Sequence, residues 1–410
     1  MNSLERFIYD RVKYLPGLKR VLVDNYQRLF ALLPVQSPET DYEIVVREGF
    51  YYGFHDKCPW SHDDSALLAH RFEDPLAMPG PDDSVEAGYF SGSEQTDFQK
   101  IGETRTWNWQ QGSMLQWLGN SDTILFNDLQ DGSHAARIVD MKGAPVRLLP
   151  RPVAALSPDG NHALSYSFVR LQKSARAYGY ANGEDLQADH PAPAEDGLFL
   201  LHTQSGEDER LFTLSELAAK DPVLTMEDAY HYISHCLFSP SGERFVFYHR
   251  WVTRRGVTYT RMFSSDLDGN NLFVFPTDGT VTHAAWKDDQ KIMAYAFTEL
   301  EGSHYYLFRD QSDEYSIVGR DQFSSDGHPQ FSPDGRRFVT DTYPDRWRVQ
   351  RLILYDVDSG ERTDLARLRS PFEYRYDVRC DLHPRWNRGG TAMAFDSAHT
   401  GVRAMCTLNL

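Results

Sequence analysis

The chain has 410 residues, of which 41% are apolar and 13% aromatic, so it can bury a large core and is not a disordered chain. Its 59 acidic and 42 basic residues give a formal net charge of −17, which argues against a nucleic-acid partner because no basic surplus offsets the repulsion of phosphates. An acidic ligand needs a local group of arginines or a metal cation to overcome this field.

The first 34 residues differ from the rest of the chain. Apolar residues recur at helical spacing from Leu4 to Leu15 and again from Val21 to Phe30, with a break at Pro16-Gly17. The pattern predicts a helical arm, assigned to residues 1–40. Six basic against three acidic residues in 1–34 would let it lie on an anionic membrane surface or dock on a partner. The alternative is a helical hairpin packed on the rest of the protein or on a second copy.

A strand–turn–strand pattern then recurs seven times. Its clearest copy is 326–340, where Ser332-Pro333-Asp334-Gly335 separates two apolar stretches; proline sets the first φ of a turn and glycine accepts a positive φ. Each copy has one apolar key residue just before the turn. The key residues are Trp60, Trp117, Leu156, Phe238, Trp286, Phe331 and Trp386. Most lie about 40 to 55 residues apart, the period of four-stranded propeller blades. The sequence therefore predicts an all-β, seven-bladed β-propeller over residues 41–410.

Two further features refine this propeller. Tyr42–Arg47 and Val402–Leu408 both read as strands, and we expect the first to complete the last blade and close the ring. The long interval between Leu156 and Phe238 predicts one blade that carries an insertion, Gln172–Asp196, and a helix near Leu214–His231.

The four cysteines are scattered without a CxxC pair, which disfavours a zinc motif. Three of them precede key residues, where small buried side chains fit, so free core thiols are expected. No apolar run resembles a signal peptide or a membrane span, and a cytoplasmic location is the expectation.

Histidines recur at one register position of the blades. Three residues before the key residue stand Lys57, Met114, Val153, His235, His283, His328 and His383. With 15 histidines in 410 residues, seven random positions would hold about 0.26, whereas four consecutive blades carry one each. The position begins the innermost strand, so these imidazoles should meet at one mouth of the central channel, where they can bind a metal or transfer protons.

Other residues could extend this site. Five residues before the key residue stand His55, Asp326 and Asp381, as further ligands or as carboxylates that orient imidazoles. Candidate carboxylate-binding and sugar-stacking residues lie at the ends of other predicted strands: Arg250, Arg346, Arg348, Trp107, Trp109 and Tyr343.

The repeat resembles that of TolB-type, WD40-like propellers, and three stretches resemble the oligogalacturonate lyase-like group of seven-bladed proteins more specifically. These are 51–60 (YYGFHDKCPW), 328–345 (HPQFSPDGRRFVTDTYPD) and 379–397 (RCDLHPRWNRGGTAMAFDS). The likeness covers about residues 42–410. It implies metal-assisted β-elimination on a uronate glycan, that is, an acidic oligosaccharide or polysaccharide. On this chain His283 and His328 match metal-ligand positions, and His235 matches the base that removes the proton at C5.

The chain departs from the group at one place. The family's metal motif has a glutamine and a second histidine shortly before the His-Pro pair, where this chain has Ser324-Ser325-Asp326-Gly327. His383 and Asp326 could replace those ligands, which would favour a harder divalent ion such as Mn or Ca.

Two other functions remain open. A glycosidase-like relative would use a single histidine near the first blade, for which His55 is the candidate, since no carboxylate pair of an ordinary hydrolase is evident. A propeller that binds glycan or protein without catalysis is the third reading.

Overall fold

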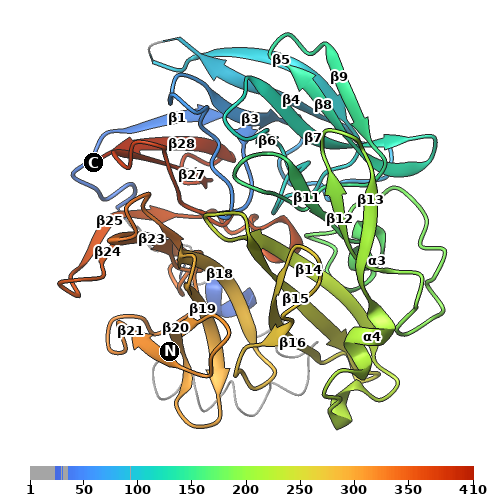
Figure 1. Cartoon of the computed structure of the whole chain (residues 1–410). Helices are drawn as coiled ribbons and strands as arrows, with labels where there is room; N and C mark the ends of the chain where they lie inside the picture. Colours follow the sequence, from blue (N-terminus) through green and yellow to red (C-terminus); the bar gives the residue numbers. More distant parts are fainter. Residues whose placement is uncertain (1–23, 29, 31–35, 93) are drawn as a thin grey trace.

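The computed structural model of the protein describes residues 24–28, 30, 36–92 and 94–410. These form seven four-stranded antiparallel sheets around a central axis (Figure 1). The predicted all-β, seven-bladed propeller is confirmed, and every key residue lies at the turn that ends the innermost part of its blade.

Strands follow the chain outward from the axis in each blade. Blade 1 contains β2 (Phe50–Tyr51), β3 (Leu67–Arg71), β4 (Val85–Ser91) and β5 (Asp97–Thr104). Blade 2 contains β6 (Gln116–Trp117), β7 (Thr123–Gln130), β8 (Ser133–Asp140) and β9 (Pro145–Leu149). Blade 3 contains β10 (Ala155–Leu156), β11 (His162–Ser165), β12 (Gly197–His202) and β13 (Asp208–Thr213). Blade 4 contains β14 (Tyr230–Phe238), β15 (Arg244–Val252), β16 (Thr258–Asp266) and β17 (Phe273–Val274).

The remaining blades repeat this plan. Blade 5 contains β18 (Val281–Asp288), β19 (Lys291–Thr298), β20 (Gly302–Arg309) and β21 (Tyr315–Val318). Blade 6 contains β22 (Gln330–Phe331), β23 (Arg337–Asp341), β24 (Val349–Asp356) and β25 (Arg362–Arg369). Blade 7 contains β26 (Arg385–Trp386), β27 (Ala392–Ser397), β28 (Ala404–Asn409) and, from the other end of the described chain, β1 (Ile44–Glu48). β1 pairs antiparallel with β28, from Ile44 opposite Leu408 to Glu48 opposite Ala404. The predicted ring closure is confirmed.

Side-chain hydrogen bonds build the turn after each key residue. In blade 6 the Ser332 hydroxyl donates to Asp334 Oδ1 at 2.6 Å, and the Gly335 amide donates to the Ser332 carbonyl at 2.8 Å. Gly335 has φ +68°, which glycine adopts without steric cost. The Ser-Pro-Asp-Gly sequence thus specifies the turn directly.

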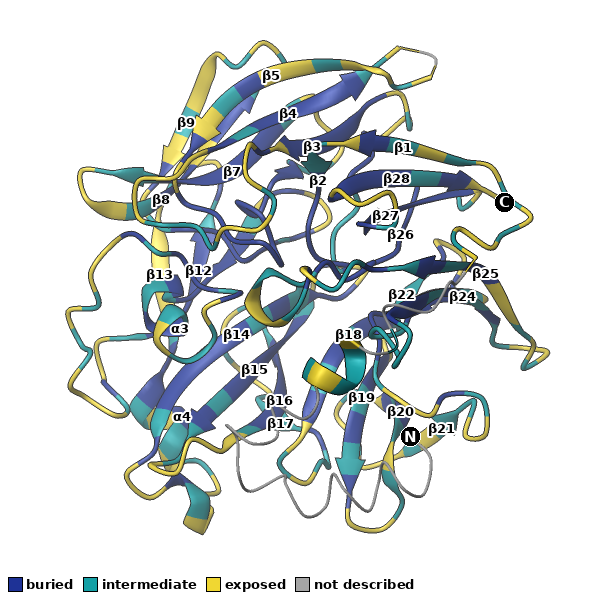
Figure 2. Cartoon of the chain, turned by 180° about the vertical axis from the view of Figure 1, so that it is seen from behind, coloured by how far each residue is buried: buried dark blue, intermediate teal, exposed yellow. Residues whose placement is uncertain are grey.

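The core lies between neighbouring blades. One cluster joins Leu352 and Val339 of blade 6 to Phe395 and Leu408 of blade 7, and all are at most 1% exposed. Figure 2 shows the inner strands buried and exposure concentrated on outer strands and loops. Each blade therefore depends on its neighbours to cover both of its faces.

The segment between blades 3 and 4 is less helical than expected. Predicted helix Leu214–His231 is instead α4 (Leu214–Ala219), capped by Thr213 and Glu216, followed by a 3-10 turn, η1 (Leu224–Met226). β14 then starts at Tyr230, because its alternating apolar residues pair along β15. A helix the sequence did not predict, α3 (Phe168–Ser174), opens the insertion and contacts β14, and a second 3-10 turn, η2 (Tyr376–Val378), precedes blade 7.

Part of the predicted arm is described. Residues 24–28 and 30 are helical, and Arg28 lies over the ring of Phe372 at 5.2 Å while Phe30 meets Trp347 at 5.7 Å. This part of the arm packs on the propeller. Residues 1–23 lie outside the described chain, and contact of residues 1–34 with a membrane or partner stays a prediction. Among the described residues, no helix has the length and apolar content to cross a bilayer. The four cysteines are free, as expected.

Candidate functional site

The four histidines that stand three residues before a key residue converge on the channel. Only two of them lie near the start of the innermost strand, as predicted. His328 and His383 lie two residues before the short strands β22 and β26, whereas His235 and His283 lie inside β14 and β18 at breaks in strand register. His235, His283 and His383 have φ of +52°, +44° and +44°, uncommon for residues with a Cβ. In β14 and β18 the break is a β-bulge, which re-aims a side chain.

His283, His328 and His383 make ring contacts with His55 or with each other, and His235 is joined to the group through Phe54. Ring centroids of His283 and His328 are 4.2 Å apart, and those of His328 and His383 are also 4.2 Å apart. His55 lies 5.5 to 6.3 Å from these three rings. Phe54 is in the middle, 5.0 Å from His235 and 5.0 Å from His383. We call His55, His235, His283, His328 and His383 the histidine cluster.

Asp341, at the end of β23, fixes the orientation of one member of the cluster. Its carboxylate accepts from His328 Nδ1 at 2.7 Å and from the His328 amide at 2.9 Å. It also accepts from the His383 amide at 3.0 Å, so one carboxylate connects blades 6 and 7. Because Nδ1 of His328 donates to Asp341, Nε2 keeps its lone pair for a ligand.

Two other histidines are held in the same way. His283 Nδ1 lies 3.0 Å from Asp326, which also accepts from Thr282 at 2.8 Å. Asp326, predicted as a metal ligand, is therefore a hydrogen-bond partner that orients His283. His55 Nδ1 lies 2.7 Å from the Pro329 carbonyl and must carry the proton, which leaves Nε2 bare.

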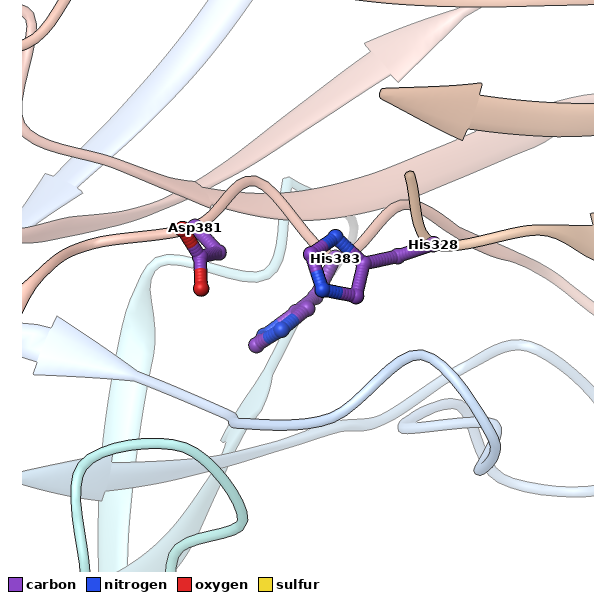
Figure 3. Close-up of side chains that lie close together, drawn as sticks. All are labelled: His328, Asp381 and His383. Carbon is purple, nitrogen blue, oxygen red and sulfur yellow. The ribbon is translucent and has the colours of Figure 1, made fainter. Parts of the chain in front are cut away.

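The nitrogens left over in this arrangement are buried and unpartnered. Nε2 of His55, His328 and His383 has no hydrogen-bond partner among the described residues, and neither has Asp381 Oδ1. The ligand atoms of His328, Asp381 and His383 all lie within 4.8 Å of one another, and Figure 3 shows the three side chains gathered at one place. Two imidazoles and a carboxylate with free lone pairs are a donor set that suits a divalent ion such as Mn.

Burial decides the protonation of most of the cluster. Desolvation lowers the pKa of His55, His235 and His383 well below the ordinary value and also lowers that of His283. Burial opposes protonation of His328 too, but the Asp341 carboxylate outweighs it, and the pKa of His328 is raised. At neutral pH the cluster is thus rich in neutral imidazoles, which can bind a metal or accept a proton.

A buried ion pair holds the segment that carries Phe54 and His55 in the channel. Asp396, in β27, accepts from the amides of Tyr52 and Gly53 at 3.0 and 2.9 Å and pairs with Arg385 at 2.9 Å. Arg385 in turn donates to the carbonyls of Gly53 and Phe54. Gly53 has φ +124°, and a Cβ there would meet the backbone of Gln111 at 2.9 Å. These hydrogen bonds and the close contact at Gly53 fix the backbone conformation of the segment.

Partly exposed polar side chains surround the cluster. The Tyr343 ring is 5.4 Å from His328, and the Tyr178 ring is 5.2 Å from His235. Arg379 donates to the Tyr178 hydroxyl at 3.0 Å and pairs with Asp381. Arg250 has no carboxylate partner among the described residues; its Nε is buried without a hydrogen bond, and its guanidinium lies 5.5 Å from the Tyr248 ring. Tyr343 and Arg250 thus lie beside members of the histidine cluster, and their contact with a glycan stays a prediction.

Other predicted sugar-binding residues have structural roles. Trp107 and Trp109 are 5% and 1% exposed, and their indoles donate to the carbonyls of Asp83 and Ala77. Arg348 is 4% exposed and donates to the carbonyls of Pro371 and Tyr374. These three predictions are corrected, because buried and satisfied side chains present no surface to a sugar.

Arg346 stacks on Trp347 at 4.1 Å beside the described part of the arm. The contacts that Arg346 makes with Phe30 and Trp347 lie outside the histidine cluster.

Sequence reasoning missed residues that orient the cluster. Asp341 and Asp396 both stand ten residues after a key residue, where the second strand of the blade ends. In blade 2 the same position is Asn127, whose side chain binds the amide and carbonyl of Val153 in blade 3. The position ten residues after the key residue is thus a second structurally important position of the repeat. Comparing this position among the blades would have identified these residues from the sequence. Tyr178 lies in the insertion, where no repeat guides alignment.

Comparisons with known proteins find a shared fold. No protein-family model and no curated protein matches the chain. Among solved structures, an oligogalacturonate lyase in complex with manganese is similar over 92% of this chain and 97% of its own, at 14% identity and a TM-score of 0.65. An oligogalacturonate lyase from Vibrio parahaemolyticus is similar over 90% and 91%, at 12% identity and a TM-score of 0.60. At these identities the likeness shows the shared propeller fold.

Proposed function

We propose that this protein is a lyase that cleaves a uronate-containing glycan by β-elimination, with a divalent metal and a histidine base. The observation that carries the proposal is the set of buried, unpartnered Nε2 atoms of His55, His328 and His383 beside the free oxygen of Asp381. The shared fold with an oligogalacturonate lyase bound to manganese supports it.

His328, His383 and Asp381 would hold the metal, because their lone pairs meet and have no other partner among the described residues. A bound divalent cation supplies charge that stabilises the negative charge developing on the uronate carboxylate. Asp341 and Arg379 keep two of these ligands in place through His328 Nδ1 and Asp381 Oδ2.

His235 is the base in this proposal. Desolvation and the nearby Arg250 cation lower its pKa, so it is neutral at pH 7 and can accept a proton. It removes the proton at C5 of the uronate, a C4–C5 double bond forms, and the C4–O4 bond breaks. The leaving oxygen takes a proton from water, and the imidazolium returns its proton to solvent. Arg250, with no carboxylate partner among the described residues, would bind the uronate carboxylate.

The test offers galacturonate and glucuronate oligosaccharides with Mn or Ca and follows the ultraviolet absorbance of the unsaturated uronate. Wild-type protein should generate it, His235→Ala should not, and His190→Ala, which removes an exposed histidine, is the matched control. Reducing ends without the absorbance would replace the proposal with a glycosidase that uses His55. Binding without turnover would replace it with a non-catalytic propeller.

A further inference from the structure

A small cavity lies beside the proposed base. Its volume is about 10 Å³, close to what a single water molecule needs. The lining residues that carry polar side-chain groups are Asp56, His235, Cys236 and Tyr248. The rest of the wall is apolar and includes Phe54 and Val246.

Three polar atoms from this wall are buried without a hydrogen bond to any described residue. They are Asp56 Oδ1, His235 Nδ1 and the Tyr248 hydroxyl oxygen. A buried polar atom left without a partner costs about 1 to 3 kcal/mol, so three around one cavity call for a shared partner. A water molecule makes two to four hydrogen bonds and can donate and accept at once.

The carboxylate of Asp56 makes a short ion pair. Asp56 Oδ2 accepts from the Lys57 ammonium at 2.7 Å, and the two side chains are 8% and 10% exposed. With Lys57 beside it, Asp56 is an acceptor at both oxygens. A water in the cavity would donate to Asp56 Oδ1, and its own oxygen would then accept from His235 Nδ1–H.

We propose that Asp56 is a positioning residue for His235, acting through one water molecule bound in this cavity. The water holds the proton of the neutral imidazole on Nδ1 and leaves the lone pair on Nε2 for proton abstraction. Tyr248 donates or accepts the third hydrogen bond of the water. This inference rests on the proposed function for its catalytic meaning, and it fixes which nitrogen of His235 is the base.

The tautomer is measured directly by NMR of ¹⁵N-histidine-labelled protein at neutral pH, with the His235 signals identified by their loss in His235→Gln. The wild-type protein should show a protonated Nδ1 and a bare Nε2. Asp56→Asn should shift His235 toward the Nε2–H tautomer, because an amide can donate to the water where the carboxylate only accepts. Asp63→Asn removes a carboxylate from an exposed turn of the same blade and should change nothing at His235.

Folding and activity are read separately. Unchanged signals of His70 and His134 report an intact propeller. If Asp56→Asn does not fold, Asp56→Asn/Lys57→Gln, which removes the charge of both ion-pair partners, tests the same tautomer. In the uronate assay Asp56→Asn should lower kcat by about 100-fold, the lower end of what a general base contributes, with KM unchanged. A bare Nδ1 in the wild type, or an unaltered tautomer in a folded variant that carries Asp56→Asn, would overturn the proposal. Because the tautomer does not depend on turnover, this result is distinct from a failure of the lyase assay.

Discussion

Asp341→Asn tests how far one carboxylate organises the histidine cluster. Asp341 is 3% exposed and accepts from three donors: the amide and Nδ1 of His328 and the amide of His383. Asparagine has nearly the same shape but only one acceptor oxygen. If that oxygen keeps the bonds to His328, the new NH₂ group faces the His383 amide, and one buried donor loses its acceptor.

The magnitude follows from these contacts. An unsatisfied buried donor costs about 1 to 3 kcal/mol, and the charge-assisted bond to His328 loses about 1 kcal/mol more, for a total of about 2 to 4 kcal/mol. A neutral His328 beside asparagine leaves no unpaired buried charge, so the larger penalty of a broken ion pair does not apply. Metal affinity should fall by about 10- to 100-fold, as when the hydrogen-bond partner of a ligand histidine is removed.

Urea denaturation of the chelator-treated protein measures the first effect, and Mn titration by calorimetry measures the second. Asp334→Asn is the matched control, because it removes the same charge from the exposed turn of the same blade without touching a histidine. If Asp341→Asn unfolds at the wild-type urea concentration and binds Mn as the wild type does, Asp341 does not organise the site and our reasoning is wrong.

Three further predictions follow from the same structure. Trp109→Ala should destabilise the protein by about 3 to 5 kcal/mol in urea denaturation, because a fully buried indole is lost. The affinity of the folded variant for glycan should equal that of the wild type. A folded variant that binds glycan more weakly would show that Trp109 belongs to the binding site. Arg385→Met should cost about 3 to 5 kcal/mol by leaving Asp396 buried and unpaired, and Arg385→Met/Asp396→Leu should recover part of that loss, whereas additive losses would count against a coupled pair. The free energy of unfolding of the chelator-treated protein should fall as pH drops below about 6.5, because the unfolded chain then binds protons while the buried His55, His235 and His383, whose pKa is lowered, stay neutral. Each of these histidines contributes up to about 1.4 kcal/mol per pH unit, and His328, whose pKa is raised, offsets part of the loss. A calorimetric unfolding midpoint that does not change from pH 7 to 5 would contradict this prediction.

The architecture was predictable because each blade repeats a local signal. Proline, aspartate and glycine after the key residue specify a turn through contacts within a few residues, as the bonds of Ser332 and Gly335 show. Such a turn can be recognised in the sequence without knowing which residues pack against it. The same alignment placed four histidines at one depth of the channel, since pseudosymmetry brings equal register positions together.

The details of the site depend on contacts between blades, which no single repeat encodes. Trp107 and Trp109 look like stacking residues in isolation, but Tyr51 and Phe72 of blade 1 cover them. Arg348 looks like a carboxylate clamp, but its guanidinium meets the carbonyls of a loop more than twenty residues later. The role of such a residue depends on which side chains and carbonyls it contacts. Those contacts form only when the ring of blades closes.

The arrangement of carboxylates explains how this chain could differ from a propeller whose metal is held mainly by histidines. Asp326 stands behind His283 as a hydrogen-bond partner, while Asp381 offers a free oxygen to the side occupied by His328 and His383. The candidate metal ligands are thus His328, Asp381 and His383. A metal held by them would lie closer to blade 7 than a metal held by His283 and residues just before His328. His235 is not part of this donor set and has Phe54, Tyr178 and Arg250 as its neighbours. Separate places for the cation and the base are what a β-elimination requires, since one binds the carboxylate while the other approaches the C5 proton.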